Sequence, residues 1–213
     1  MKKERLVIFD MDGTLIDSSE AMTQSVNYVR NAIGLETPVS KEALEYHINA
    51  LDQQLPKIFY NTETYHPEHR ALFKEHYMQY APSNISLYPD VRQMLEVLSQ
   101  KAHLGIATNA HDCFAHNMLD ALDIAHYFSG GIVGANNVAE PKPSPLMVEE
   151  LMKTFGAKAE ETVLVGDSIK DEQAAFNAGV SFIFANWGYG KSQTSNLRAH
   201  NVHELLLLLN TLI

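Results

Sequence analysis

The stretch VIFDMDGTLIDS (7–18) joins a short apolar run to three acidic residues and a glycine. The run begins at Leu6 and ends at Asp10, which is typical of a buried central strand, and Gly13 marks the turn that follows. In such a turn the side chains of Asp10 and Asp12, two positions apart, can face one pocket. Burying an unpaired carboxylate costs free energy, so acids at the mouth of a strand indicate a functional site.

Short apolar runs recur through the second half of the chain, separated by helical patterns. Strands are predicted at 103–108, 130–134, 162–166 and 181–185, and helices near 89–100, 112–123, 144–155, 171–178 and 202–213. This alternation predicts an α/β fold whose doubly wound parallel sheet is covered by helices on both faces. Ligands bind such sheets beyond the carboxyl ends of the strands, and Asp10, Thr108 and Asp167 all fall there.

Residues 17–85 interrupt this alternation, because no strand pattern occurs there. Helical patterns lie near 18–33, 40–58 and 67–80. We therefore expect an α/β core made of residues 1–16 and 86–213, with an all-helical insertion over 17–85 after the first strand. The segment APSNISLYPD (81–90) contains prolines and small polar residues, which suits a linker back to the core.

The composition sets outer limits on function. The chain has 213 residues, 46% of them hydrophobic, which suits one domain or one domain with a smaller insertion. A formal net charge of −10 argues against a general binder of nucleic acid or anionic membranes, so a phosphate site would need locally recruited positive charge. No run reaches the ~20 apolar residues of a membrane helix. The single cysteine, Cys113, excludes an internal disulfide and favours a reducing, cytoplasmic setting.

A second acidic motif repeats the design of the first. In VLVGDSIKDEQAA (163–175) an apolar strand and a glycine precede Asp167 and Asp171. A further carboxylate beside Asp10 would repel it strongly unless a cation lay between them. A hard divalent cation fits, and magnesium suits a site of few carboxylates, waters and a substrate phosphate. The alternative is structural: Asp167 would start a turn, and Asp171 would favour the positive N-terminal end of the next helix.

Two further segments supply groups that can bind phosphate. GIATNA (105–110) ends a strand at Thr108 and Asn109, where a hydroxyl, an amide and a helix N-terminus can bind phosphate oxygens, although both residue types are also common N-caps. AEPKPSP (139–145) places Lys142 between two prolines. Lys142 could neutralise a bound phosphate and keep Asp10 ionised; the alternative is a solvent-exposed loop lysine.

With DMDGTLIDS, ATN, PKP and GDSIKDEQAA in this order, the chain resembles the haloacid dehalogenase superfamily, in its phosphatase branch. The resemblance covers both ends of the chain and implies a Rossmann-like core. It implies that Asp10 is a nucleophile that forms an aspartyl-phosphate, and that Asp12 protonates the leaving alcohol and then activates water. Phosphoryl transfer depends mainly on in-line positioning and charge neutralisation, which these motifs would supply.

The resemblance also implies two sets of binding residues and one kind of partner. The substrate phosphate would be held by Asp10, Gly13, Thr108, Asn109 and Lys142. Mg²⁺ would be held by Asp10, Asp167 and the backbone carbonyl of Asp12, with Asp171 supporting the metal site or Lys142. The expected partner is a small phosphorylated metabolite.

The insertion at 17–85 resembles the cap that this superfamily places after its first motif. Such caps close over the site, exclude bulk water and contact the part of the substrate that is not phosphate. The acidic turn, the cap position and NWGYG (186–190) are similar to those of the phosphoglycolate phosphatase branch. Magnesium-dependent hydrolysis of a small phosphomonoester, with phosphoglycolate as the first candidate, is therefore the expected activity.

Three alternative functions stay open. A sugar-phosphate mutase of the same superfamily is the nearest, although the insertion has no Ser-Arg pair of the kind those relatives use. A binding protein that kept the fold and lost the chemistry would be expected to lack Asp10, Asp12 or Lys142. ANWGYGKS (185–192) ends as a nucleotide-binding P-loop does, but Ala185 occupies the position of its first glycine.

Two histidine pairs, His66/His69 and His200/His203, have the i, i+3 spacing that can share a helix face. Neither pair has a third metal ligand nearby in the sequence, so surface histidines are the expectation. Cys113 is expected to be a small, buried or half-buried residue rather than a reactive thiol.

Overall fold

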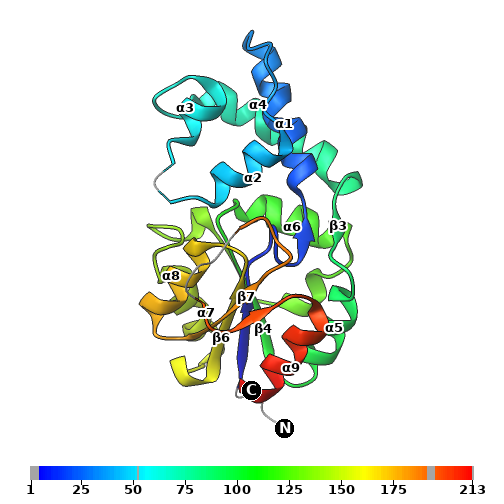
Figure 1. The fold of residues 1–213 in the computed structure, drawn as a ribbon, viewed down its shortest axis with the longest axis vertical. Coiled ribbons are helices and arrows are strands. Elements are labelled where there is room, and N and C mark those ends of the chain that lie inside the picture. Colours follow the sequence, from blue (N-terminus) through cyan, green and yellow to red (C-terminus); the bar gives the residue numbers. More distant parts are fainter. Residues whose placement is uncertain (1–4, 52, 191–194, 213) are drawn as a thin grey trace.

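A computed structural model describes residues 5–51, 53–190 and 195–212 (Figure 1). Within these residues, a six-stranded sheet has the order β5-β4-β1-β6-β7-β8, and every adjacent pair is parallel. Its strands are β1 (Leu6–Phe9), β4 (His103–Thr108), β5 (Ile132–Gly134), β6 (Thr162–Gly166), β7 (Ser181–Ala185) and β8 (Arg198–Ala199). The first strand of the chain therefore lies inside the sheet, between β4 and β6, as its continuous apolar sequence requires.

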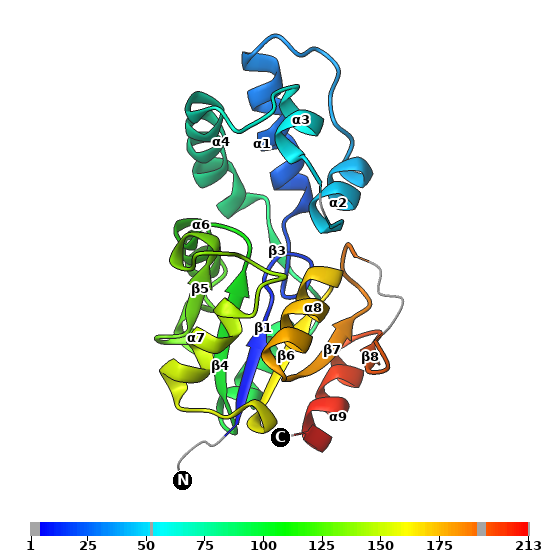
Figure 2. The same cartoon turned by 90° about the vertical axis from the view of Figure 1, so that its left-hand side faces the viewer.

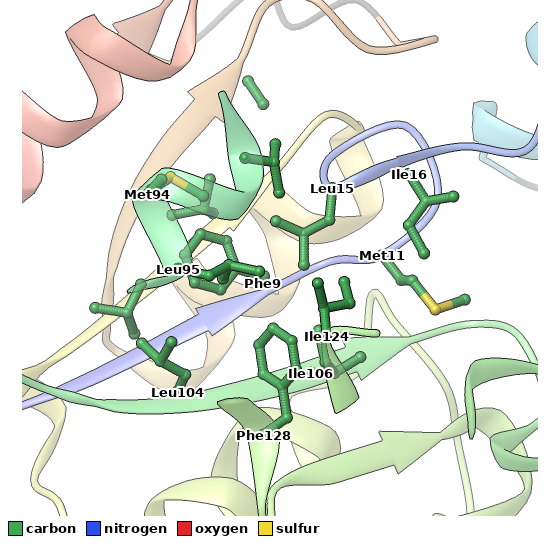
Figure 3. Packing of buried hydrophobic residues seen from close by; sticks show 14 of the residues in the cluster. Phe9, Met11, Leu15, Ile16, Met94, Leu95, Leu104, Ile106, Ile124 and Phe128 are labelled. Carbon is green, nitrogen blue, oxygen red and sulfur yellow. The ribbon is translucent and has the colours of Figure 1, made fainter. Parts of the chain in front are cut away.

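The sheet is buried on both faces. Successive side chains of β1 point to opposite faces, so Leu6 and Ile8 join one hydrophobic cluster while Val7 and Phe9 join the other. One cluster includes residues of α5 (Val91–Ser99), α6 (Asp112–Ala121) and α9 (Val202–Leu212), and the other residues of α7 (Leu146–Phe155) and α8 (Ile169–Ala178). Figure 3 shows Phe9 packed close to Leu95 on the first of these faces. The prediction of a doubly wound parallel sheet is confirmed.

A group of helices stands apart from the sheet, at one end of the molecule (Figures 1 and 2). These helices are α1 (Ser19–Ala32), α2 (Lys41–Asn49), α3 (Leu55–Tyr60) and α4 (Pro67–Tyr80). They share a small hydrophobic cluster of their own, built on Val26, Val29, Leu44, Phe59 and Tyr60. The chain enters and leaves this group through β2 (Ile16–Asp17) and β3 (Ser86–Leu87), which pair antiparallel with Ile16 opposite Leu87.

The structure differs from the sequence predictions in three places. The single helix expected over 40–58 is two helices, because Pro56 lacks an N–H and is accommodated in the first turn of α3 rather than inside a longer helix. The strands β2, β3 and β8 are only two residues long and carry no periodic signal. Short 3₁₀ turns connect other elements, namely η1 (Ala81–Ser83), η2 (Ala125–Phe128), η3 (Ala135–Asn137) and η4 (Ala159–Glu161).

Every helix within residues 5–51, 53–190 and 195–212 is too short or too polar to cross a bilayer.

Candidate active site

The candidate site lies where three neighbouring strands end. β1 pairs in parallel with β4 on one side and with β6 on the other. Asp10 directly follows β1, Thr108 closes β4, and Asp167 directly follows β6, so the three residues meet at one edge of the sheet. Asp171, in the first turn of α8, joins them: one carboxylate oxygen from each of Asp10, Asp167 and Asp171 lies within 4.8 Å of the others.

Lys142 is buried against two of these carboxylates. Its Nζ atom lies 2.6 Å from Oδ1 of Asp10 and 2.5 Å from Oδ1 of Asp171, and it donates to the carbonyl of Ala107 at 2.6 Å. Burial lowers the pKa of Lys142, but the charges of Asp10 and Asp171 outweigh it and raise this pKa above its usual value. Since the side chain is only 2% exposed, the alternative of a solvent-exposed loop lysine is wrong.

Asp167 is held by a glycine-containing loop that follows β7. Its Oδ2 atom accepts hydrogen bonds from the backbone N–H groups of Tyr189 at 2.7 Å and Gly190 at 3.0 Å. A Cβ atom placed on Gly13 or on Gly188 would lie 2.5 Å from the same oxygen, and Gly13 has a φ of +87°. Glycine is therefore required at Gly13 both by its backbone conformation and by the close approach of Asp167.

Asp171 is fixed by the start of its own helix. Its Oδ2 atom accepts from the backbone N–H of Ser168 at 3.0 Å and from the Ser168 hydroxyl at 2.5 Å, while the same hydroxyl accepts from the N–H of Asp171 at 3.3 Å. These reciprocal bonds form a capping box at the N-terminus of α8. Because Oδ1 contacts Lys142, Asp171 both caps the helix and orients the lysine.

Asp12 faces the segment that leads into α1. Its Oδ1 atom accepts a hydrogen bond from the hydroxyl of Ser18. Burial raises the pKa of Asp12 to about 6, even though the Ser18 hydrogen bond acts in the opposite direction. A carboxyl group with such a pKa can both donate and accept a proton near neutral pH, which is what general acid and base catalysis requires.

Tyr189 contacts both Asp167 of the acidic cluster and the start of α1. Its hydroxyl accepts hydrogen bonds from the backbone N–H groups of Ser18 at 2.7 Å and Ser19 at 3.0 Å, and it donates to Oδ1 of Asp17 at 3.2 Å. The N-cap residue of α1 makes no side-chain capping bond, so Tyr189 satisfies helix N-terminal donors from outside the helix. The backbone N–H of the same tyrosine binds Asp167.

Replacing Tyr189 with phenylalanine is expected to cost about 1–3 kcal/mol of unfolding free energy, because two partly buried N–H groups lose their acceptor. Chemical denaturation measures the loss. Tyr28→Phe is the matched control: Tyr28 lies on α1 with its side chain 45% exposed, and its replacement should change stability by less than about 0.5 kcal/mol. Equal stability of the two variants would show that the Tyr189 hydroxyl does not hold α1.

Thr108 and Asn109 occupy different environments. Thr108 is buried, and its hydroxyl accepts from the backbone N–H of Ala110 at 3.1 Å, as in a local turn. Asn109 is exposed, and its side chain pairs with the backbone of Lys142: Nδ2 donates to the carbonyl at 2.9 Å and Oδ1 accepts from the N–H at 3.0 Å. Asn109 therefore orients the segment that carries Lys142.

The carboxylate cluster carries more negative charge than one lysine can balance. Burial raises the pKa of Asp10 well above its usual value, although Lys142 opposes this. Burial, together with the charge of Asp171, raises the pKa of Asp167 to about 7. An all-oxygen donor set of this kind fits a hard divalent cation. Among the described residues, these three acids form the group spaced to hold a metal ion, and neither histidine pair belongs to such a group.

A cleft of about 660 Å³ opens from the site toward the helical group. Asp10, Asp12, Thr108, Asn109 and Lys142 line one part of it, and residues of α1, α2, α3, α4 and α6 line much of the rest. Lys170 of α8 donates to the carbonyl of Ile48 at 2.6 Å, which connects the two walls. The site is therefore a cavity between the sheet edge and the helices, as pockets in open α/β sheets commonly are.

Sequence analysis assigned no role to two serines that position the site. Ser18 and Ser168 hold Asp12 and Asp171. The sequence signal of Ser18 is its place beside Asp17, whereas Ser168 begins the S-x-x-D pattern of a capping box, SIKD (168–171). Tyr189 belongs to ANWGYGKS, whose described part, 185–190, binds Asp167 through two backbone N–H groups. The Gly-Lys-Ser end of that stretch, on which the P-loop alternative depended, extends into residues 191 and 192, which lie outside the described residues.

Comparison with known proteins places this geometry among hydrolases. The family model described as haloacid dehalogenase-like hydrolase matches residues 7–185. A phosphoglycolate phosphatase of Aquifex aeolicus is 30% identical over 88% of this chain and 87% of its own length. The enzyme of the same name from Photorhabdus laumondii is 31% identical over 91% of this chain and 85% of its own. A crystal structure of a predicted phosphoglycolate phosphatase from Haemophilus somnus matches with a TM-score of 0.82 at 25% identity, covering 98% of this chain and 99% of that one.

Proposed function

Because the chain belongs to the haloacid dehalogenase-like hydrolase family, we propose that it hydrolyses a small phosphomonoester with Mg²⁺, through an aspartyl-phosphate on Asp10. Its relatives named phosphoglycolate phosphatase support a phosphatase activity. The observation that carries the proposal is the contact of buried Lys142 with both Asp10 and Asp171 at the floor of the cleft. A cation fixed beside a carboxylate in a cavity suits the binding of a dianionic phosphate.

In the first step an oxygen of Asp10 attacks phosphorus, and the bond from phosphorus to the alcohol oxygen breaks. Asp12 donates its proton to that oxygen, so the substrate leaves as a neutral alcohol. The pKa of Asp12, raised to about 6 by burial, keeps part of the population protonated near neutral pH. In the second step Asp12 takes a proton from water, which attacks phosphorus and releases phosphate and the carboxylate of Asp10.

The other predicted residues have binding roles in this proposal. Lys142 neutralises the phosphoryl oxygens, Thr108 supplies a hydroxyl beside them, and Gly13 lets the backbone approach. Asn109 acts through its paired contacts with the Lys142 backbone. Asp171, whose two oxygens contact Lys142 and Ser168, supports the lysine.

Mg²⁺ would be held by Asp10, Asp167 and the backbone carbonyl of Asp12, and it would neutralise charge on the phosphoryl group. The buried carboxylates, whose pKa values lie above their usual range, support this assignment because they favour a counter-ion. The helices of residues 17–85 would act as a cap over the 660 Å³ cleft, excluding water and contacting the rest of the substrate. We place the enzyme in the cytoplasm, in keeping with its single cysteine.

Phosphate release from a panel of small phosphomonoesters, with Mg²⁺ and with a chelator, tests the proposal. The panel includes phosphoglycolate, sugar phosphates and nucleotides. Release that depends on Mg²⁺ supports the phosphatase. Isomerised sugar phosphate without released phosphate would support the mutase alternative, and binding without any turnover would support the silent binding protein.

Replacing Asp12 with asparagine is expected to lower kcat by about 10²–10⁴-fold, because asparagine cannot give a proton to the leaving alcohol. Steady-state phosphate release measures this loss. An activated ester with a good leaving group, such as 4-nitrophenyl phosphate, needs less protonation in the first step, so the loss of the first-step rate should be smaller there. An equal loss of that rate for both kinds of ester would contradict the acid role of Asp12.

The affinity for Mg²⁺ is expected to fall by at least about tenfold between pH 8 and pH 6, because a proton on Asp167, with a pKa of about 7, competes with the cation. Isothermal titration calorimetry at both pH values measures the change. In Asp167→Asn the affinity should be weak at both values. Equal Mg²⁺ affinity of the unchanged protein at pH 6 and pH 8 would argue against Asp167 as a ligand.

The stability of the metal-free protein should fall between pH 6 and pH 8, whereas its affinity for Mg²⁺ should rise. The folded-state pKa of Asp167 lies above its usual value, so the folded protein holds this proton more tightly than the unfolded chain. Its contribution to stability is therefore present near pH 4 and is lost as the pH rises through about 7. Mg²⁺ should accordingly raise Tm more at pH 8 than at pH 6.

A further inference from the structure

The cleft as a whole, including its phosphate end at Asp10 and Lys142, is larger than a phosphorylated two-carbon acid requires. Its volume of about 660 Å³ lies within the range of about 300–1,000 Å³ typical of pockets for drug-sized ligands. The phosphate end is polar, whereas the walls from the helical group carry Met22, Val26 and Leu44. A substrate that fills this space has a mainly apolar body attached to its phosphate.

Aromatic rings make up much of the lining of the cleft. The aromatic side chains that line it are Phe59, Tyr60, Tyr65, Phe73, Tyr77 and Phe114. Several of them are fixed by one another: the rings of Phe73 and Tyr77 stack at 5.2 Å, and Phe114 meets Tyr77 edge-on at 5.2 Å. Fixed aromatic walls favour a flat ring, because rings pack in stacked or edge-to-face arrangements with little loss of freedom.

Two buried polar atoms in these walls lack a protein partner. They are Nδ1 of His69 and Nδ2 of Asn49, found without a hydrogen bond among the described residues, and both residues line the cleft. The ring of His69 is only 9% exposed and packs against Tyr60 at 5.4 Å between centroids. Because an unsatisfied buried polar atom is unfavourable, a ligand that supplies its partner is favoured.

The cations near the cleft are poorly placed for a small carboxylate held deep inside it. Arg70 and Lys74 are exposed, and the Arg70 guanidinium lies 4.9 Å from the ring centre of Tyr65. Lys170 already donates to the carbonyl of Ile48. Among the described residues, the cleft-lining polar atoms without a protein partner thus belong to the amide of Asn49 and the imidazole of His69, which suit ring heteroatoms or ring substituents.

We propose that the substrate is the phosphate ester of a primary alcohol borne on a flat heteroaromatic ring, whose polar atoms bind Asn49 and His69 while the aromatic walls enclose the ring. This inference rests on the proposed phosphatase function and deepens it. The alcohol released from such a substrate carries the flat ring and the polar atoms that the cleft would bind. Phosphoglycolate has no ring and lacks the bulk to reach Asn49, His69 and the aromatic walls.

A matched series of esters tests the proposal: pyridin-3-ylmethyl, benzyl and cyclohexylmethyl phosphate, with phosphoglycolate as the reference and Mg²⁺ present throughout. All are phosphates of primary alcohols, so the first three differ chiefly in the ring. We expect kcat/KM for pyridin-3-ylmethyl phosphate to exceed that for phosphoglycolate by at least tenfold, with benzyl phosphate between them. Cyclohexylmethyl phosphate should fall below benzyl phosphate.

Variants of the two unpartnered residues sharpen the test. Asn49→Leu and His69→Leu should each lower kcat/KM for pyridin-3-ylmethyl phosphate at least fivefold and change that for phosphoglycolate less than twofold. Asn31→Leu, on an exposed part of α1, is the control and should change neither. If His69→Leu fails to fold, Asn49→Leu and the ester series on the unchanged protein still decide the question.

Two other results would overturn the proposal in distinguishable ways. Phosphoglycolate turned over tenfold better than every ring ester, with loss of that preference in Arg70→Gln or Lys74→Gln, would overturn the ring substrate and leave the phosphatase standing. Absence of Mg²⁺-dependent phosphate release from all the esters would overturn the proposed function and this inference with it. Equal turnover of benzyl and cyclohexylmethyl phosphate would overturn the requirement for a flat ring.

Discussion

Replacing Asp10 with asparagine is expected to lower phosphate release by at least about 10⁴-fold while the protein stays folded. The loss is large because the amide cannot form the covalent phosphoryl intermediate, so both steps of the proposed reaction disappear. Steady-state kinetics with the best ester of the panel measures the rate. Acid quenching during turnover should trap a phosphorylated protein for the unchanged chain and none for the variant.

The stability of Asp10→Asn separates a chemical defect from a folding defect. Since burial raises the pKa of Asp10 well above its usual value, its charged form is unfavourable in the metal-free protein. Metal-free Asp10→Asn should therefore be at least as stable at pH 8 as the unchanged chain. Asp120→Asn, an exposed change on α6, is the control and should retain full activity. Turnover of Asp10→Asn within tenfold of the unchanged chain would exclude Asp10 as the nucleophile.

Replacing Lys142 with methionine is expected to cost about 3–5 kcal/mol of unfolding free energy at pH 8 without metal. The change leaves Asp10 and Asp171 buried without the cation that lies 2.6 Å and 2.5 Å from them. In a chain of 213 residues this corresponds to a fall in Tm of about 6–20 °C. Thermal unfolding followed by circular dichroism measures it, and turnover should fall at least about 10²-fold through loss of phosphoryl neutralisation.

The pH dependence of the stability loss in Lys142→Met shows whether charge or packing causes it. Without Lys142 the carboxyl group of Asp10 loses the charge that opposes the rise of its pKa, so lowering the pH lets it take up a proton and should return part of the lost stability. Lys153→Met, whose side chain is 78% exposed, is the matched control and should change stability by less than about 0.5 kcal/mol. A loss of stability in Lys142→Met that is independent of pH would point to packing rather than charge.

The sequence allowed much of the sheet to be predicted because its signals are local. The run at Leu6–Phe9 and its counterparts are short, apolar and followed by polar turns, so their burial on both faces follows from composition alone. Strand order was not predicted, because it depends on which strands pair across distances of a hundred residues. The break between α2 and α3 is not predicted, because the residues before and after Pro56 both fit a helical pattern.

Some residues of the candidate site could likewise be predicted from the sequence, and others could not. The sequence predicts that three site residues lie close together, because Asp10, Thr108 and Asp167 each fall at the end of a strand of one parallel sheet. Ser18 and Tyr189 could not, since the hydroxyl of Tyr189 reaches Ser18 across 171 residues and no local pattern encodes that contact. Their importance follows from the tertiary structure: one holds Asp12, and the other holds both Asp167 and the start of α1.

The short antiparallel pair β2 and β3 has an evolutionary consequence. Asp17 and Ser86 lie opposite one another, so the helical group of residues 18–85 leaves the core and returns to it at adjacent points. A tight two-residue turn could in principle join such a pair directly. Whole helical modules can therefore be exchanged, shortened or lengthened at this junction during evolution without moving a strand of the sheet. Ser18 is one residue that restrains such exchange, since any replacement module must still present a donor to Asp12.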